Sequence, residues 1–206
     1  MKMLNGYYIG NTESKCKYCN GSKQEECVND CSSTINTLSD ISLSLIEEAQ
    51  WNTAGIRSIQ ISEIVTAYIT ERSEQNAKMC SLGDYCNDGV LRTTNWKGKI
   101  GLIYPSDYGY ASVNEDCSRD ILGNDSGCNE KNWLHPSSGY YWTISAYARS
   151  TYANVVWCIS SSDRVYDYGA SNARGVRPTL NLKSNVTFVG EGNGTEESPY
   201  ILGINE

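Results

Sequence analysis

The sequence predicts an α+β fold whose sheet is mainly antiparallel. Helix-type patterns occur in the first half of the chain, and short strand-type runs separated by turn residues follow in the second half. Helices and strands do not alternate, so nothing indicates a parallel sheet with crossover helices. The 206 residues suit one hydrophobic core. We therefore expect a single domain over residues 1–206, with a Cys-rich segment (1–35), a helical part (36–80) and a strand and loop part (96–206).

Two helices are expected in the helical part. The first covers residues 39–51, because Ser39 or Asp40 can cap its N-terminus and apolar residues recur at helical spacing behind it. The second begins at Ser62, and Glu71 and Arg72 are expected to return to solvent at its end. Its predicted core-facing residues are Ile64, Ala67, Tyr68 and Ile69.

The strand and loop part contains short β-type runs bounded by turn residues. They lie at residues 99–104, 140–145, 154–160, 164–168 and 176–182. A first strand is expected at residues 4–9, and residues 200–202 can form a short edge strand. Residues 105–139 are rich in Ser, Asp, Asn and Gly, and we expect a long irregular loop there.

Charge and hydropathy exclude some classes of function. The chain has 17 basic and 24 acidic residues, a formal charge of -7, and its basic residues are scattered, so nucleic-acid binding is not expected. No run approaches the roughly 20 apolar residues of a membrane span, so we expect no membrane contact by this segment. Residues 1–10 also lack the apolar core of a signal peptide. Export would need a signal or an anchor helix upstream.

Nine cysteines indicate covalent stabilisation in an oxidising compartment. Eight are candidates for disulfides: Cys16, Cys19, Cys27, Cys31, Cys80, Cys86, Cys117 and Cys128. Local pairing of Cys80 with Cys86 and of Cys117 with Cys128 would each close a short polar loop. The ninth, Cys158, lies in an apolar run, where a free thiol behaves as a small buried hydrophobe. The expected location is extracellular or on the cell surface.

Two metal sites remain as alternatives to this disulfide interpretation. Cys16, Cys19, Cys27 and Cys31 have the paired spacing of a tetrahedral zinc site, although zinc would not explain the later cysteines. The acidic loop residues Asp116, Asp120, Asp125 and Glu130 could contribute oxygen ligands to calcium, but their spacing matches no calcium loop. We therefore predict no metal. Phosphate-binding loop motifs are missing from the sequence, and no cofactor is expected.

Four segments in the second half resemble the end of C-type-lectin-like domains related to the formylglycine-generating enzyme fold. They are Tyr141-Trp-Thr-Ile-Ser145, Asn154-Val-Val-Trp-Cys158, Asp163-Arg-Val165 and Arg174-Gly-Val-Arg-Pro178. In that family a Trp-bearing strand, a strand ending in a polar hairpin, a return strand and a Gly-(Val/Phe)-Arg-Pro strand follow in this order. The resemblance implies a C-type-lectin-like fold stapled by disulfides.

A closer resemblance covers nearly the whole chain. Its segments include Tyr7-Tyr-Ile-Gly-Asn11, Ile46-Glu-Glu-Ala-Gln-Trp51, residues 98–111, Asn132-Trp-Leu134 and Asn181-Leu-Lys-Ser-Asn-Val186. Together they are similar to surface proteins of gut Firmicutes and Mollicutes, some of which resemble pilin-like precursors with an N-terminal membrane helix. This resemblance names a fold better than a function.

The resemblance implies binding and not catalysis. Formylglycine-generating enzymes need a pair of catalytic cysteines, whereas this chain offers only Cys158 in its last strands, so we expect no enzyme activity. The variable proteins of diversity-generating retroelements share the fold and display changeable side chains from the last strands and loops. The corresponding candidates for ligand binding are Tyr147, Arg149, Tyr152, Asn154, Tyr166, Tyr168, Ser171 and Asn172.

Tyrosine enrichment supports this expectation on physical grounds. The chain has 15 Tyr and one Phe, and a rigid amphipathic ring gives a large contact area at a small entropic cost. The alternative is that these tyrosines are only the solvent-facing half of antiparallel strands. The expected function is recognition of a protein or glycan ligand at the cell surface. The globular head of a pilin-like subunit is the first alternative, and an enzyme of the formylglycine-generating type is the less favoured one.

Overall fold

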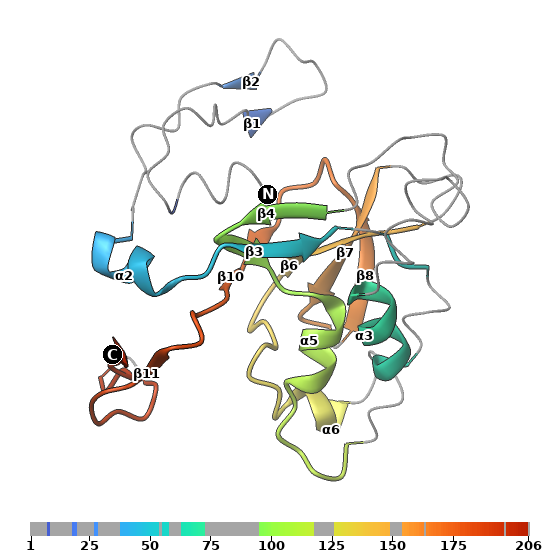
Figure 1. The fold of residues 1–206 in the computed structure, drawn as a ribbon. Helices are drawn as coiled ribbons and strands as arrows, with labels where there is room; N and C mark the ends of the chain where they lie inside the picture. Colours follow the sequence, from blue (N-terminus) through green and yellow to red (C-terminus); the bar gives the residue numbers. More distant parts are fainter. Residues whose placement is uncertain are drawn as a thin grey trace. The chain divides into compact units, whose positions relative to one another are not determined.

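The computed structural model describes residues 8, 18–19, 27–28, 38–53, 55–57, 63–72, 95–117, 126–148, 154–162, 164–195 and 197–205. In these ranges the chain is α+β, with short helices and mostly antiparallel strand pairs, as predicted (Figure 1). Close contacts group the chain into two compact units. The first contains Met1–Ala49, Gly98–Ile100 and Leu180–Glu206, and the second contains Gln50–Lys97 and Gly101–Thr179. The single domain over residues 1–206 stays a prediction.

A four-stranded sheet is the central element of the second unit. Its order is β8-β7-β6-β9, and it is formed by β6 (Tyr140–Ala146), β7 (Val155–Ser160), β8 (Arg164–Gly169) and β9 (Gly175–Val176). Strands β6, β7 and β8 are antiparallel, and β9 runs parallel to β6. The predicted strands at 140–145, 154–160 and 164–168 are confirmed. The run at 176–182 divides into β9 and β10 (Pro178–Leu180), which pairs with β5 (Ile100–Leu102).

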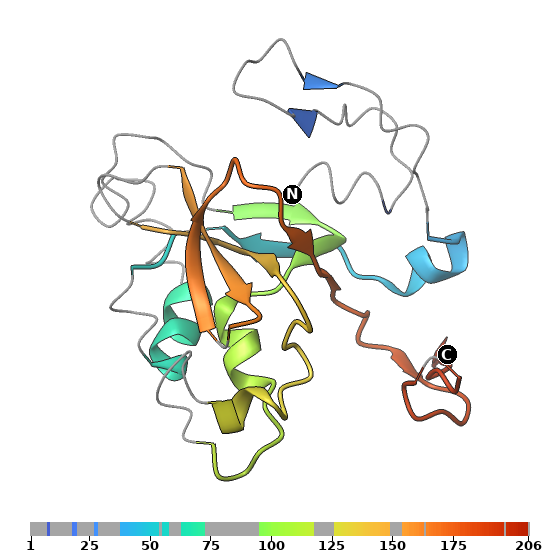
Figure 2. The same cartoon turned by 180° about the vertical axis from the view of Figure 1, so that it is seen from behind.

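The hydrophobic core of the second unit lies on one face of this sheet. Helices α3 (Ile64–Arg72) and α5 (Pro105–Tyr110) contact each other, and α5 also contacts β6 and β7 (Figures 1 and 2). Because side chains alternate along a strand, only every second residue of β7 enters this core. The buried cluster consists of Ile56, Ile64, Ala67, Ile103, Tyr108, Ala111, Leu134, Tyr141, Tyr147, Val155, Trp157, Ile159 and Val165.

Helix α3 follows the prediction only in part. Ile64 and Ala67 are buried as expected, but Tyr68 and Ile69 are 45% and 61% exposed, so their predicted core position is wrong. Glu71 was expected in solvent and is instead 1% exposed. Glu71 can be buried because its carboxylate accepts hydrogen bonds from the backbone N–H and the hydroxyl of Ser106 at the start of α5.

The predicted helix at 39–51 is half helix and half strand. Helix α2 (Asp40–Leu45) begins after Ser39, whose hydroxyl accepts a hydrogen bond from the Ser42 N–H, so Ser39 and not Asp40 is the cap of the two predicted. The backbone then turns extended, and β3 (Ala49–Asn52) pairs with β4 (Asn95–Gly98). Strand pairing and burial of the Trp51 ring outweigh the helical spacing of the apolar residues.

The predicted irregular loop at 105–139 contains two short helices, α5 and α6 (Ser126–Asn129). Helix α5 starts at a proline that needs no backbone partner, and Asp107 accepts a hydrogen bond from the Tyr104 N–H at 2.8 Å. The predicted disulfide between Cys117 and Cys128 is confirmed, with Cα atoms 5.4 Å apart. The loop is therefore stapled and partly helical.

The first unit is built from short elements. Strands β11 (Val186–Phe188) and β12 (Leu202–Ile204) form an antiparallel pair, so the expected edge strand at 200–202 begins two residues later than predicted. The backbone of β1 (Tyr18–Cys19) pairs with that of β2 (Cys27–Val28). The Lys99 ammonium donates to the Leu43 and Ile46 carbonyls at 2.6 and 3.0 Å and so caps the end of α2. The strand expected at 4–9 lies outside the described residues except for Tyr8.

No helix in the described part of the chain is both long and apolar enough to span a membrane.

A close approach in the second unit gives the first testable prediction. A Cβ atom at Gly101 would lie 2.7 Å from the ring of Trp51. We expect Gly101→Ala to lower the free energy of unfolding by about 1–3 kcal/mol through overpacking, measured by urea denaturation. In a Trp51→Leu background the same change should cost less, because the ring is gone. If the two substitutions changed the free energy of unfolding by strictly additive amounts, Gly101 would not pack against the Trp51 ring.

Candidate binding surface

The face of the four-stranded sheet opposite the core is the candidate site. Cross-strand neighbours share a face, and the register places Trp142 beside Cys158 and Cys158 beside Tyr166. Trp142 also lies beside Val176 of β9. We call this surface the outer face. Its members by strand register are Tyr140, Trp142, Ala146, Val156, Cys158, Ser160, Arg164, Tyr166, Tyr168 and Val176. Arg174 joins them because its guanidinium lies over the rings of Tyr140 and Tyr168.

Three half-buried tyrosines form a row across the outer face. Tyr166 and Tyr168 come from β8, two residues apart, and their ring centroids are 5.9 Å apart. Tyr140 of β6 continues the row, with its centroid 5.6 Å from that of Tyr168. These distances fall in the range of favourable aromatic contacts. The row therefore holds its rings in defined positions and keeps part of each ring in solvent.

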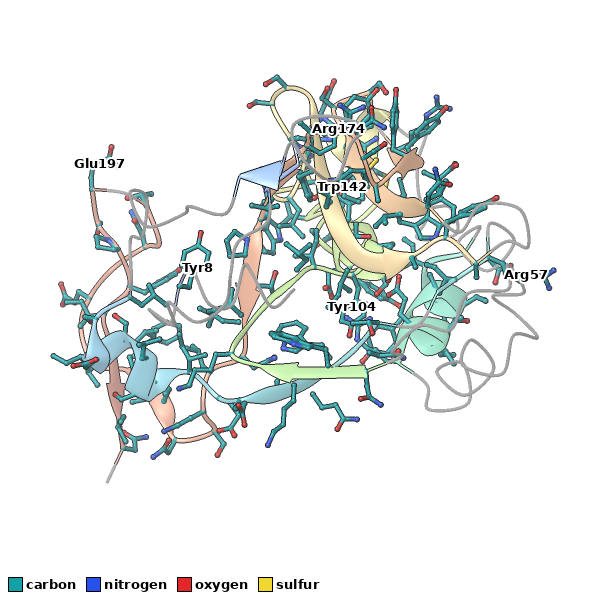
Figure 3. All side chains as sticks on the ribbon, turned by 90° about the horizontal axis from the view of Figure 1, so that it is seen from above. Tyr8, Arg57, Tyr104, Trp142, Arg174 and Glu197 are labelled. Atoms are coloured by element: carbon teal, nitrogen blue, oxygen red, sulfur yellow. A yellow bond between two sulfur atoms is a disulfide. The ribbon has the colours of Figure 1, made fainter. Side chains whose placement is uncertain are left out.

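Two arginines cover these rings. The Arg174 guanidinium carbon lies 4.6 Å from the Tyr140 centroid and 4.2 Å from the Tyr168 centroid, so one cation contacts both rings. Arg164 lies 4.6 Å from the centroid of Tyr166 at the other end of the row. Such contacts are cation–π interactions, worth about 0.5–1 kcal/mol at exposed sites. Arg174 is labelled in Figure 3, as is Trp142 of the neighbouring strand β6.

The Cys158 thiol lies within the sheet below this row. It is fully buried and unpaired, which confirms the prediction for this cysteine. Burial raises the pKa of Cys158 to about 11, and the positive charge of Arg174 lowers it only in part. At neutral pH the thiol is uncharged, so it serves as a small hydrophobic contact under the row.

Five of the eight predicted ligand-binding residues are at or near this surface. Tyr166 and Tyr168 are members of the outer face. Asn154, Ser171 and Asn172 are exposed in the loops that join its strands. The Asn172 side chain donates to the Gly169 carbonyl at 2.9 Å, which fixes the turn after β8.

Tyr147 was predicted in the binding set, and its place on the surface is wrong. It is 7% exposed, and its ring centroid lies 4.9 Å from that of Trp157 in the core. The pairing of β6 with β7 shifts by two residues between Trp142 and Ala146, which keeps the alternation, so Tyr147 lies on the same core side as Tyr141. The remaining two, Arg149 and Tyr152, lie outside the described residues.

Sequence reasoning missed Tyr140 of the row and both arginines that cover it, Arg164 and Arg174. Alternation along the predicted strand at 164–168 could have found Arg164, because it shares a face with Tyr166 and Tyr168. Arg174 could not be found in this way, since its contact with Tyr140 depends on the parallel pairing of β6 with β9.

Of the predicted disulfide cysteines, only Cys117 and Cys128 have described side chains. Cys16, Cys31, Cys80 and Cys86 lie outside the described residues. The Cα atoms of Cys19 and Cys27 are paired across β1 and β2, and only their backbone is described. Among the described side chains, no group of three or more His, Cys, Asp or Glu residues could hold a metal ion. The zinc and calcium alternatives rest largely on residues beyond that part.

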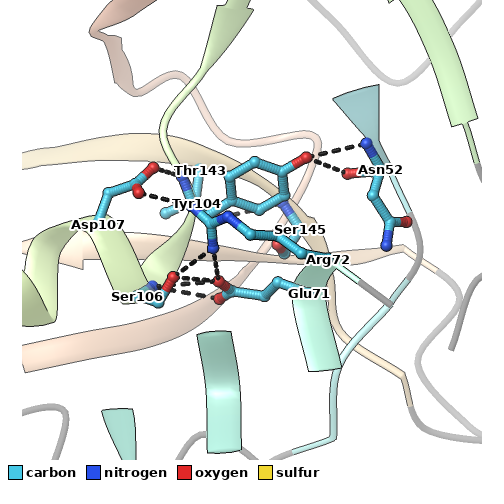
Figure 4. A network of polar contacts seen from close by, with 8 residues as sticks. All are labelled: Asn52, Glu71, Arg72, Tyr104, Ser106, Asp107, Thr143 and Ser145. Carbon is cyan, nitrogen blue, oxygen red and sulfur yellow. Dashed lines mark hydrogen bonds and ion pairs between the residues drawn. The ribbon is translucent and has the colours of Figure 1, made fainter. Parts of the chain in front are cut away.

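A second polar cluster joins α3 to α5 inside the second unit (Figure 4). One Arg72 nitrogen donates to Glu71 at 3.1 Å and to Ser106 at 2.7 Å, and another donates to Asp107 at 2.7 Å. The Arg72 guanidinium also lies 4.3 Å from the Tyr104 centroid. The Tyr104 hydroxyl in turn donates to the Asn52 carbonyl at 3.0 Å and accepts from the Asn52 N–H at 2.9 Å. This network links both helices to β3.

Burial dominates the acid–base behaviour of this network. It raises the pKa of Glu71 from 4.5 to about 7, while the hydrogen bonds from Ser106 and the charge of Arg72 oppose the increase. The carboxylate oxygens of Glu71 accept hydrogen bonds from the backbone N–H and the hydroxyl of Ser106. The residue is almost inaccessible to solvent. We interpret the cluster as a structural connection between helices, because it offers a ligand little access.

Comparisons of the chain with protein-family models, with curated proteins and with solved structures found no match. The C-type-lectin-like resemblance stays a prediction from the sequence.

The buried carboxyl of Glu71 predicts a pH dependence of stability. Because its pKa is raised in the folded protein, the native state holds the proton more tightly than the unfolded chain does. Its contribution is complete below about pH 4.5 and is lost as the pH rises through about 7. We expect a loss on the order of 3 kcal/mol across this window, and Glu71→Gln should remove most of it.

Urea denaturation at pH 4.5, 6 and 7.5 measures this effect. The matched control is Glu130→Gln, which neutralises an exposed carboxylate of the same unit and should keep the wild-type profile. Equal pH profiles for wild type and Glu71→Gln would show that Glu71 does not hold its proton in this way.

Proposed function

We propose that the protein is a recognition domain of the cell surface or extracellular space, which binds a protein or glycan ligand through the outer face of its four-stranded sheet. The observation that carries the proposal is the row of Tyr140, Tyr168 and Tyr166 with Arg174 and Arg164 against the rings. Tyr and Arg, with Trp, are the residue types enriched among binding hot spots.

The organisation of the row supports binding more than packing alone. A sheet has to bury only one face, and here the buried face already has its core against α3 and α5. The outer rings and guanidinium groups are nonetheless held in place by one another, so little side-chain entropy remains to be lost when a ligand binds. Ser171 and Asn172 add exposed hydrogen-bonding groups beside the row.

The proposal also covers where the protein is located and whether its α+β fold is C-type-lectin-like. Disulfides persist mainly in oxidising compartments, and the Cys117–Cys128 disulfide supports an extracellular or surface location. A C-type-lectin-like fold is supported by the sequence segments that resemble that family and by the mainly antiparallel α+β architecture. An experimental structure with full side-chain density would test the finer fold directly.

Binding to arrays of glycans and of extracellular proteins tests the function. We expect a ligand whose affinity falls at least tenfold when Tyr166 or Tyr168 is replaced by alanine, because each ring supplies a hot-spot contact. Tyr200→Ala is the matched control, since Tyr200 is 53% exposed but belongs to the first unit. Surface plasmon resonance with each purified variant gives the affinities.

Two results would contradict the proposal. One is a ligand that binds all three variants with wild-type affinity, since its site would then lie elsewhere. The other is the absence of any ligand that responds to the tyrosine substitutions in either array. Thermal denaturation of each variant separates loss of binding from loss of folding.

A further inference from the structure

The chemistry of the outer face also indicates which partner it recognises. Building on the proposed function, we infer that the guanidinium groups of Arg174 and Arg164 bind carboxylates on an acidic segment of a protein partner, which lies across the tyrosine row. The inference rests on three features: how the arginines are held, what surrounds them, and how their charge compares with that of the whole chain.

Arg174 is held in place without an acidic partner. Its guanidinium makes cation–π contacts with the rings of Tyr140 and Tyr168. One terminal nitrogen also donates a hydrogen bond to the Ala173 carbonyl at 3.0 Å. Its Nε–H is buried and has no acceptor, one of two such side-chain atoms in the described residues. Both ion pairs among the described side chains belong to Arg72, so neither Arg174 nor Arg164 is neutralised there by a carboxylate.

An arginine in this state is suited to a carboxylate ligand. The guanidinium presents its N–H donors in a planar fork that matches the two oxygens of a carboxylate, and charge-assisted pairs are about twice as strong as neutral ones. Stacking on tyrosine leaves the edge of that fork as its hydrogen-bonding surface. Arg174 already has its position fixed by two rings, so binding costs it less conformational entropy than a free surface arginine would lose.

The surroundings favour a protein over a sugar polymer. Val176 is 50% exposed, and Trp142 is half-buried beside it on the outer face. The eleven members of the outer face include two Arg and no Lys, Asp or Glu. Enrichment in aromatic residues and Arg, with depletion of Lys and acidic residues, is the composition of the centre of a protein–protein interface.

The charge of the whole chain argues that such recognition is local. The formal charge of -7 repels an acidic partner at long range, so general electrostatic attraction does not bring it to this face. Asp167, the nearest acidic residue along β8, pairs with Trp157 and so belongs to the opposite face by alternation. The two arginines therefore form a positively charged site on a negatively charged protein. Short-range pairing of this site with carboxylates gives specificity for an acidic segment.

Poly-L-glutamate is the probe for this inference, and polygalacturonate provides the same carboxylate on a sugar backbone. We expect immobilised poly-L-glutamate to bind the wild-type protein at moderate salt. Arg174→Gln should weaken this binding about tenfold or more, as loss of a charge-assisted pair does. Arg174→Lys should lose part of the affinity, because the charge stays but the planar fork is gone.

Lys131→Gln is the matched control. It removes one positive charge from an exposed position of the same unit, away from the outer face. An equal loss with Lys131→Gln and Arg174→Gln would reduce the effect to net charge and overturn the inference. Because Arg174→Lys keeps the charge and length of the side chain, it keeps the test decisive if Arg174→Gln folds poorly.

The remaining outcomes are equally decisive. Binding to polygalacturonate without binding to poly-L-glutamate would overturn the assignment to a protein partner. A neutral ligand that depends on Tyr166 and Tyr168, with no binding to poly-L-glutamate, would overturn this inference and leave the proposed recognition function standing. Failure of both experiments would remove the proposed function as well.

Discussion

The architecture of the second unit depends on β7, which lies inside the four-stranded sheet with a neighbour on each side. Its alternate residues divide the unit into two environments. Trp157 and Ile159 enter the core, where the indole N–H of Trp157 donates to the Ile56 carbonyl at 3.1 Å. Cys158, between them, lies on the other face under the tyrosine row. A shift of one residue in this strand would exchange the two environments.

The two faces therefore have different chemistry for one reason. The inner face has to exclude water, and it does so with apolar side chains from the sheet and from α3 and α5. The polar network of Glu71, Arg72 and Ser106 sits where those helices meet, and its donors satisfy a carboxyl that burial would otherwise make costly. On the outer face, the rings and guanidinium groups contact one another.

The strands of the sheet could be predicted because local alternation and turn residues determine them. The Cys117–Cys128 pair could also be predicted, since it closes a short polar loop. Failures occurred where distant contacts decide the outcome. Trp51 lies in a strand because β4 pairs with it, and Glu71 is buried because α5 supplies its donors.

The binding surface shows the same limit. Tyr166 and Tyr168 follow from the period of two residues along β8, and the same period puts Tyr147 on the core side of its strand with Tyr141. The place of Arg174 required knowledge of which strand lies next to β6. Periodicity predicts which side chains share a face of one strand, and only the pairing of strands tells which of them meet.

The central claim is that alternation separates outward tyrosines from core tyrosines, and residue-resolved nitration of the folded protein tests it most directly. Peptide mass spectrometry after brief treatment with tetranitromethane measures the modification of each ring. We expect Tyr140, Tyr166 and Tyr168 to be nitrated, and Tyr108, Tyr141 and Tyr147 to be protected because they are buried in the core. Nitration of Tyr141 and Tyr147 at the rate of Tyr166 and Tyr168 would contradict the account.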